Sequence, residues 1–230
     1  MSERQDAGRI GAHAVLSQLF AGGVSQVGDG GHLTGMRKRA VVGPVAVSAE
    51  GVRGDDIVDR RFHGGPDRAL NVFAQEYYAH LKQDFPQPDE PWLPGGFGEN
   101  LSTVGLLDHE LRLGDTFRVG TVVIQLSQPR SPCWKLNARF GVPQLSRHVQ
   151  DQRMTGWYAR VLEPGLMEAG DSIELLNRDE SVPTLAGFWD LVLARDPDLD
   201  RLAALAGLDG LAAEWQEKLA RRAQYLKQKG

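Results

Sequence analysis

Hydrophobic residues in this chain occur mostly in short runs, each about as long as one β-strand. Such runs cover 15–20, 39–47, 69–73 and 116–126, and Gly120-Thr121 interrupts the last of them as the turn of a hairpin would. Many short strands with few helices between them favour a mixed, mainly β barrel over a doubly wound sheet. The pattern therefore predicts a mixed α/β, mainly β fold with helices at its periphery.

A recurring turn supports the barrel. Gly114-Asp115 precedes the strand pattern at 116–119, and Gly170-Asp171 precedes a similar pattern at 172–176. The repetition indicates a barrel assembled from irregular hairpins. We expect peripheral helices over 74–83 and 154–162.

The pattern changes after Pro183 to a spacing of three and four residues. Apolar side chains then share one helix face over 185–193, with Thr184 as the cap, and two further helices follow. About 47 residues are too few for a robust independent domain, so we expect these helices to dock on the barrel or on a partner subunit. The sequence predicts three units: an N-terminal extension with the first strand (1–35), a barrel (36–180, with its first strand from about residue 13) and a three-helix appendage (184–230).

Composition narrows the classes of protein that fit. A net charge of -4 and a pI near 5.9 argue against an electrostatic nucleic-acid binder. One cysteine rules out an internal disulfide and, without a recognisable signal peptide, fits a reducing cytosol. No apolar run approaches the roughly 20 residues of a membrane helix. We therefore expect a cytoplasmic protein with no nucleic-acid or membrane partner.

Cys133 has the most informative surroundings in the sequence. It follows the apolar run 122–126, stands next to Pro132, and has Arg130 and Lys135 close in the chain. Nearby cations, or a helix beginning at the cysteine, favour the thiolate, which is both the nucleophilic and the metal-binding form. A buried, unreactive cysteine explains this local context equally well.

Three further polar segments could bind an anion. Residues 60–68 combine arginines with His63-Gly64-Gly65, residues 95–101 place Glu99-Asn100 among glycines, and residues 36–39 are basic. Each segment alone is also explained as a surface turn, a loop or a strand end. Zinc-binding, Walker, dinucleotide-binding and Gly-x-Ser-x-Gly patterns are absent from the sequence.

Taken together, these segments resemble the signature blocks of MOSC domain proteins, with the YiiM-like branch as the nearest match. The blocks are His63-Gly64-Gly65-Pro66-Asp67-Arg68-Ala69, Phe97-Gly98-Glu99-Asn100-Leu101 and Ser127-Gln128-Pro129-Arg130-Ser131-Pro132-Cys133, in the order of the family. Gly54-Asp55 and Lys38 also match that branch, and the C-terminal helices resemble its three-α domain. The glycine-rich N-terminal extension and Trp134 depart from the pattern, and Trp134 could alter a substrate pocket.

The resemblance implies a MOSC-type β-barrel that binds a molybdenum cofactor of the molybdopterin type, with Cys133 as the molybdenum ligand. It implies reduction of N-hydroxylated compounds such as hydroxylaminopurines, amidoximes or hydroxamates, with electrons from a separate protein. His63 or Glu99 would supply a proton. The expected cofactor-binding residues are Lys38, Arg60, His63, Arg68, Asn100, Arg130 and Cys133.

Two other functions stay open from the sequence. A metal-free enzyme could use Cys133 as nucleophile and His63 as base. A non-catalytic protein could carry the cofactor, sulfur or a metal to a partner. The sequence does not identify the substrate, the electron donor or the oligomeric state, and a homodimer is one of the open cases.

Overall fold

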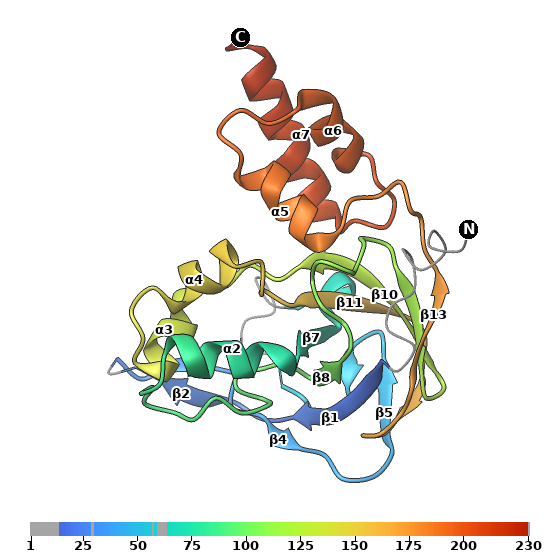
Figure 1. Cartoon of the computed structure of the whole chain (residues 1–230). Helices are drawn as coiled ribbons and strands as arrows, with labels where there is room; N and C mark the ends of the chain where they lie inside the picture. Colours follow the sequence, from blue (N-terminus) through green and yellow to red (C-terminus); the bar gives the residue numbers. More distant parts are fainter. Residues whose placement is uncertain (1–13, 29, 57, 59–63, 230) are drawn as a thin grey trace, which may run out of the picture.

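The computed structural model describes residues 14–28, 30–56, 58 and 64–229. Its main element is an eight-stranded sheet with the order β13-β9-β10-β11-β7-β8-β1-β4, which curls into a barrel-like shape (Figure 1). The strands of this sheet are β1 (Val15–Ala21), β4 (Arg39–Ala40), β7 (Leu70–Ala74), β8 (Leu101–Val104), β9 (Thr116–Val119), β10 (Val122–Pro129), β11 (Trp157–Glu163) and β13 (Ile173–Asn177).

The curl brings β13 and β1 together, although they lie far apart in the sheet order. Val15 forms an isolated antiparallel bridge with Ser172, and the Leu16 amide donates to the Asp171 carbonyl at 2.9 Å. These bonds supply backbone partners to strand ends that would otherwise be open edges. The mixed, mainly β fold predicted from the sequence is confirmed.

Smaller elements surround the main sheet. A three-stranded sheet has the order β12-β5-β6, and β2 pairs with β3 as a hairpin. Helices α2, α3 and α4 lie along one side of the barrel (Figure 1). The bounds of these elements are β2 (Ser25–Val27), β3 (His32–Thr34), β5 (Val45–Ser48), β6 (Gly51–Val52), η1 (Pro66–Arg68), α2 (Glu76–Asp84), α3 (Trp134–Phe140), α4 (Leu145–Asp151) and β12 (Gly165–Met167).

Most short-range predictions agree with these elements. The first strand, the 116–126 hairpin and the helix over 74–83 correspond to β1, to the antiparallel pair β9–β10 and to α2. The helix predicted over 154–162 is wrong, because this stretch contributes β11, which pairs with β10 and β7. Trp157 is buried and Tyr158 half-buried, the start of an alternation typical of a strand.

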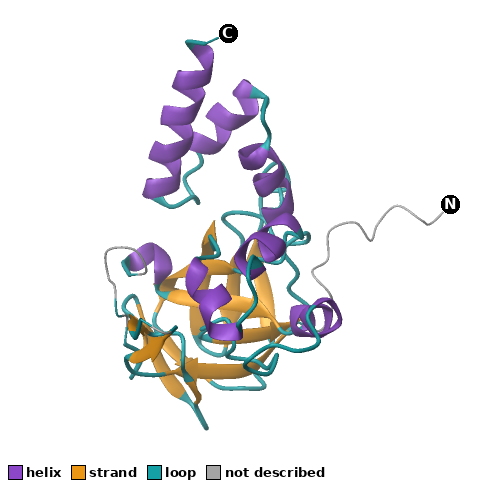
Figure 2. Cartoon of the chain, turned by 90° about the vertical axis from the view of Figure 1, so that its left-hand side faces the viewer, coloured by secondary structure: helices purple, strands orange, loops and turns teal. Residues whose placement is uncertain are grey.

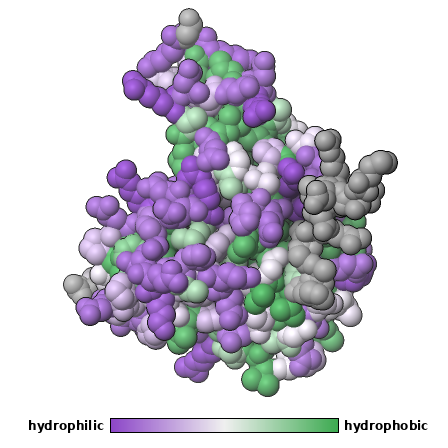
Figure 3. All heavy atoms as spheres, viewed as in Figure 1, coloured by the Kyte–Doolittle hydropathy of each residue, from purple (hydrophilic) through white to green (hydrophobic). Residues whose placement is uncertain are grey.

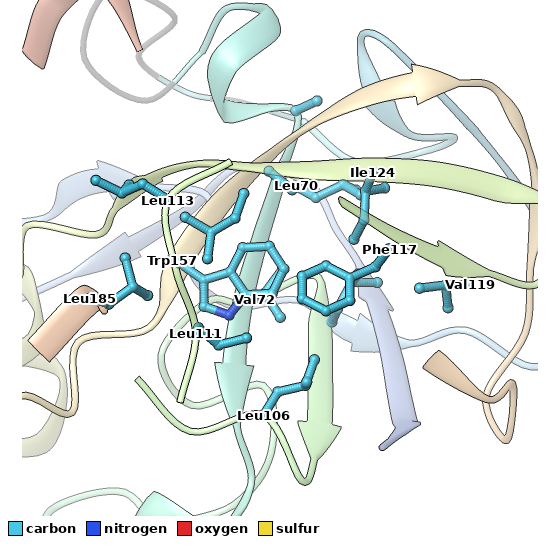
Figure 4. Close-up of a cluster of buried hydrophobic side chains, with 14 of the residues drawn as sticks. Leu70, Val72, Leu106, Leu111, Leu113, Phe117, Val119, Ile124, Trp157 and Leu185 are labelled. Carbon is cyan, nitrogen blue, oxygen red and sulfur yellow. The ribbon is translucent and has the colours of Figure 1, made fainter. Parts of the chain in front are cut away.

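Two hydrophobic clusters hold the barrel and its helices together. The interior cluster includes Trp157, Phe117 and Val72, which point toward one another inside the barrel (Figure 4). The second cluster lies between the sheet and helices α2–α4, and Phe73, Phe97 and Phe140 are part of it. Burying one such side chain contributes about 1.5–3 kcal/mol, so each cluster stabilises the fold substantially.

The C-terminal helices are α5 (Leu185–Leu193), α6 (Leu199–Ala206) and α7 (Ala213–Lys227), and they project from one end of the barrel (Figure 2). Thr184 caps α5 as predicted, accepting a 3.1 Å hydrogen bond from the Gly187 amide. Polar residues cover most of the visible face of this projection, and apolar residues gather where it meets the barrel (Figure 3).

The contact between this helical unit and the barrel is apolar with a few directed hydrogen bonds. Leu185 and Phe188 belong to the same cluster as the barrel interior. The Trp189 indole donates to Thr155 Oγ1 at 3.1 Å, and the Ala212 amide donates to the Ser127 carbonyl at 2.9 Å. The sequence predicted that these helices dock on the barrel or on a partner subunit, and in the structure they contact the barrel. The division into units at residues 36 and 184 stays a prediction.

None of the helices in the described part of the chain is both long and apolar enough to cross a membrane.

A buried carboxylate lies beneath this contact. Asp108 is fully buried and accepts hydrogen bonds from the amides of Thr155 (2.9 Å) and Gly156 (3.1 Å), from the Thr155 hydroxyl and from the Tyr77 hydroxyl. Burial raises the pKa of Asp108 to about 6, and these hydrogen bonds oppose the shift. The same Thr155 hydroxyl binds Trp189, so the carboxylate supports the docking of α5.

This raised pKa makes a testable prediction about stability and pH. Between the unfolded pKa of 3.8 and the folded value of about 6, the folded state binds more protons, so stability rises as the pH falls. From pH 7 to pH 5 the wild type should gain about 1 kcal/mol relative to Asp108→Asn, measured by urea unfolding. Asp209→Asn, at an exposed position, is the control. If the difference in unfolding free energy between the wild type and Asp108→Asn did not change with pH, the raised pKa would be contradicted.

Candidate functional site

A solvent-open cleft with a cavity volume of about 100 Å³ lies near the first residues of β7 and β8 and the last residues of β10. Five chain segments and Tyr158 of β11 form its walls. The lining residues of these segments are 34–36 and 38, 55, 56 and 58, 68, 69 and 71, 97, 98 and 100, and 130, 131, 133 and 135. Four cationic side chains and two acidic ones lie among the lining residues, so the cleft is suited to an anionic ligand.

Cys133 lies on the wall of this cleft, at the position that precedes helix α3. Its thiol is free and half-buried. Its carbonyl accepts from the Leu136 amide at 3.1 Å, in the first turn of α3. Lys135 Nζ donates to the Leu33 carbonyl at 2.9 Å, which joins the start of α3 to β3, next to the lining residue Thr34. The Cys133 backbone is therefore anchored at the start of α3, and its half-buried thiol borders the cleft.

Arg130 is a buried cation on the same wall. Its Nη2 donates to the Phe97 carbonyl at 2.9 Å, and its guanidinium lies over the Phe97 ring, 5.6 Å from the centroid. Its Nη1 is also buried, and it has no hydrogen-bond partner among the described residues. A buried N–H without an acceptor costs about 1–3 kcal/mol, so this atom is suited to an anionic or carbonyl oxygen of a ligand.

Lys38 is buried and its charge is already compensated. Its ammonium forms an ion pair with Asp55, and both side chains are less than a tenth exposed. Asp55 also accepts from the Gly22 amide at 3.0 Å and from Asn100 Nδ2 at 2.8 Å. Burial lowers the pKa of Lys38 and the ion pair opposes that shift. Lys38 therefore contributes less net positive charge to the cleft than its position suggests.

Asn100 lines the cleft, but its side chain is occupied by the protein. Besides binding Asp55, its Nδ2 donates to the Phe20 carbonyl at 3.2 Å, and its Oδ1 accepts from the Asn71 amide at 3.1 Å. Asn100 thus joins segments that lie far apart in the sequence. This geometry makes it a residue that positions the wall rather than a free hydrogen-bonding group.

Asn71 supplies the free amide atom that Asn100 lacks. It lines the cleft and is nine-tenths buried, and its Nδ2 donates to the Gly98 carbonyl at 3.2 Å. Its Oδ1 accepts no hydrogen bond within the described residues. Sequence reasoning missed this residue. The available signal was a single polar position inside the apolar run of β7.

Glu99 is not among the residues that line the cleft. It is fully buried, and its carboxylate accepts from the amides of Gly95 (2.6 Å) and Phe97 (3.0 Å) and from the hydroxyls of Tyr78 (2.7 Å) and Ser102 (2.8 Å). Burial, and next the Glu99 charge, raises the pKa of Tyr78. The sequence predicted Glu99 as a proton donor, but this environment fits a residue that shapes the 95–100 loop.

Glycine lets this loop approach the opposite wall. Gly98 has a φ of 71°, and a Cβ added to it would lie 2.9 Å from the Cα of Met36. Any larger residue would push the two walls apart or strain the backbone.

The remaining predicted residues divide into two groups. Arg68 lines the cleft with Lys38, Asn100, Arg130 and Cys133, so the structure brings five of the predicted residues together. His63 and Arg60 lie outside the described residues, and their roles stay predictions. Across the described ranges, no group of three or more His, Cys, Asp or Glu side chains could hold a metal ion.

The family model of the MOSC domain matches residues 59–174. The chain belongs to the MOSC domain family. This MOSC protein is 35% identical over 195 residues to Protein YiiM of Escherichia coli (strain K12), covering 84% of this chain and 85% of YiiM. Its fold is similar to the crystal structure of YiiM from Geobacillus stearothermophilus, with a TM-score of 0.78 and 26% identity, covering 91% of this chain and 99% of the other. These likenesses support its place in the YiiM-like branch.

A third relative carries a functional name. This MOSC protein is 34% identical over 191 residues to a protein of Gibberella moniliformis (strain M3125 / FGSC 7600) named Reductase, covering 82% of this chain but 34% of that longer protein. MOSC domains are associated with molybdenum-cofactor binding, and the family together with this relative fits a role related to that cofactor.

The position of Glu99 makes a prediction that separates a structural from a catalytic role. Glu99→Gln places an NH2 group among four donors, so it should destabilise the MOSC fold by about 1–3 kcal/mol in urea unfolding. Ser102→Ala, which removes one of the four bonds, should cost less, about 1 kcal/mol. A Glu99→Gln protein of wild-type stability would contradict the structural role.

Proposed function

We propose that this MOSC domain protein is a molybdenum-cofactor-dependent reductase of N-hydroxylated compounds, with Cys133 as the protein ligand of molybdenum. The observation that carries the proposal is that Cys133 shares a cleft wall with Arg130, a buried cation with an unsatisfied N–H. A soft thiolate and an unpaired guanidinium N–H suit a cofactor that combines a soft metal with a phosphate.

The unpaired polar atoms of the cleft fit such a cofactor. Arg130 Nη1 needs an acceptor, which a phosphate oxygen supplies, and Asn71 Oδ1 needs a donor, which an N–H of a pterin ring supplies. Lys38 and Asn100 are bound to Asp55 and would act by holding the wall in place. Arg68 adds a second guanidinium at the cleft.

When bound, the cofactor supplies two-electron oxygen-atom chemistry at its metal. The chain's own residues would bind the cofactor, orient the substrate and deliver protons. Reducing an N–OH group to N–H releases water and consumes two protons and two electrons. We assign proton delivery to His63 rather than to Glu99, because the Glu99 carboxylate is enclosed by four donors. The electrons would come from a separate protein, since the sequence carries no dinucleotide-binding fingerprint and has a single cysteine.

The first test of this proposal replaces the metal ligand. Cys133→Ser should lose molybdenum and activity toward a hydroxylamino compound while keeping its fold, because a hydroxyl is a hard, weakly ionised ligand of similar size. The measurement is molybdenum by elemental analysis and oxidised pterin by fluorescence, on protein from a host that makes the cofactor. Ser131→Ala, at a neighbouring lining residue, is the matched control. If Cys133→Ser retained molybdenum and reduced the substrate at the wild-type rate, the metal assignment would be wrong.

The second test concerns the unsatisfied guanidinium. Arg130→Met keeps an apolar stem over Phe97 but removes the charged donor, so pterin content after purification should fall at least about tenfold. The variant also loses the Nη2 hydrogen bond to the Phe97 carbonyl, which should cost about 1 kcal/mol of stability, so pterin content is measured per folded protein. Arg147→Met, at an exposed position, controls for loss of charge. Unchanged pterin content in Arg130→Met would remove Arg130 from the site.

A further inference from the structure

Two of the cations that line the cleft have carboxylate partners, and these two partners differ in their surroundings. Asp55, the partner of Lys38, is 8% exposed and is also bound by Gly22 and Asn100. Glu214, the partner of Arg68, is 69% exposed. Asp55 cannot leave Lys38 without losing buried hydrogen bonds, whereas Glu214 can turn into water at little cost.

Glu214 does not belong to the barrel. It lies in the first turn of α7, in the helical unit. The start of α7 is held against β10 because the Ala212 amide donates to the Ser127 carbonyl, while the Ser127 hydroxyl donates to the Asp67 carbonyl at 2.5 Å. Asp67 is next to Arg68 in η1. The segment that carries Arg68 and the turn that carries Glu214 are therefore joined through β10.

Arg68 itself is well placed to bind a ligand. Its side chain is 13% exposed and lines the cleft, so little water competes for its guanidinium. A guanidinium can bind a phosphate or a carboxylate through two parallel hydrogen bonds, but Glu214 contacts Arg68 through one oxygen, Oε2 to Nη2, and its side chain is largely exposed. An anion that enters the cleft would therefore compete well with Glu214 for Arg68.

We propose that Arg68 is the exchangeable anion ligand of this cleft and that Glu214, supplied by the helical unit, is the counterion that a phosphate-bearing ligand displaces. This deepens the proposed function, since the cofactor phosphate is the ligand that the proposed function would bring to the cleft. Glu214 is a positioning residue that acts through Arg68. Displacing it removes one contact between α7 and the barrel, so occupancy of the cleft and docking of the helical unit become linked, each weakening the other.

The test is a titration of cofactor-free protein with inorganic phosphate at low ionic strength, followed by isothermal calorimetry. Glu214→Gln removes the competing charge and should bind phosphate about two- to fivefold more tightly than the wild type. Arg68→Met should bind about tenfold or more weakly. In the double variant, Glu214→Gln should add nothing to Arg68→Met, because its effect depends on Arg68.

Glu217→Gln is the matched control. Glu217 lies on the same helix and is similarly exposed, but it pairs with Arg221 within α7. This variant should bind phosphate like the wild type. The inference is overturned if Glu214→Gln is indistinguishable from Glu217→Gln or binds more weakly, if Arg68→Met binds like the wild type, or if the wild type binds no phosphate at millimolar concentration.

Pterin content identifies the source of the anion. Higher pterin retention in Glu214→Gln than in Glu217→Gln assigns the exchange to the cofactor phosphate, whereas tighter phosphate binding with equal pterin retention assigns it to another anionic ligand. A negative phosphate titration would not affect the molybdenum content expected of the wild type and of Cys133→Ser. The two experiments therefore test this inference and the proposed function independently.

Discussion

The buried ion pair between Lys38 and Asp55 is the interaction on which the architecture of the cleft depends. Through Asp55 it joins the segment after β1, at Gly22, to the loop before β8, at Asn100. Asn100 in turn binds the backbone of Phe20 and Asn71. Removing one partner of such a pair would leave a buried charge uncompensated, which costs about 3–5 kcal/mol. The ion pair thus connects parts of the cleft wall that come from separate segments of the chain.

Buried carboxylates bind backbone amides at two further irregular segments, through Glu99 and Asp108. Asp55, Glu99 and Asp108 are all buried, and each accepts hydrogen bonds from backbone amides of irregular segments. Backbone amides in these loops have no strand partner to accept their hydrogen bonds, and a buried carboxylate accepts them instead. Among the described residues that line the cleft, Arg130 Nη1 and Asn71 Oδ1 are the buried side-chain atoms left without a hydrogen-bond partner.

Local patterns predicted the parts of this fold that depend on local sequence. The 116–126 hairpin and the Thr184 cap are both readable from spacing and turn residues. The strand β11 was misread as a helix because its mixed residues show no clean alternation until its two neighbours, β10 and β7, are known. The structure gathers Lys38, Arg68, Asn100, Arg130 and Cys133 in one cleft, and their roles there stay predictions. The sequence could not predict which of these side chains are already bound by other protein groups, because the partners are distant in the chain. Asp55 is 17 residues from Lys38, and Glu214 is 146 residues from Arg68.

The helical unit contacts the barrel through a charged pair as well as through apolar side chains. A unit that only filled a hydrophobic face would meet the barrel through apolar contacts such as those of Leu185 and Phe188. Here the first turn of α7 also presents a carboxylate to a cation of the cleft. Asp55 is buried and Glu214 is exposed, so Lys38 and Arg68 respond differently to an incoming anion. Lys38 stays paired with Asp55, whereas the counterion of Arg68 can leave. The C-terminal helices are therefore part of the electrostatics of the cleft as well as of its support.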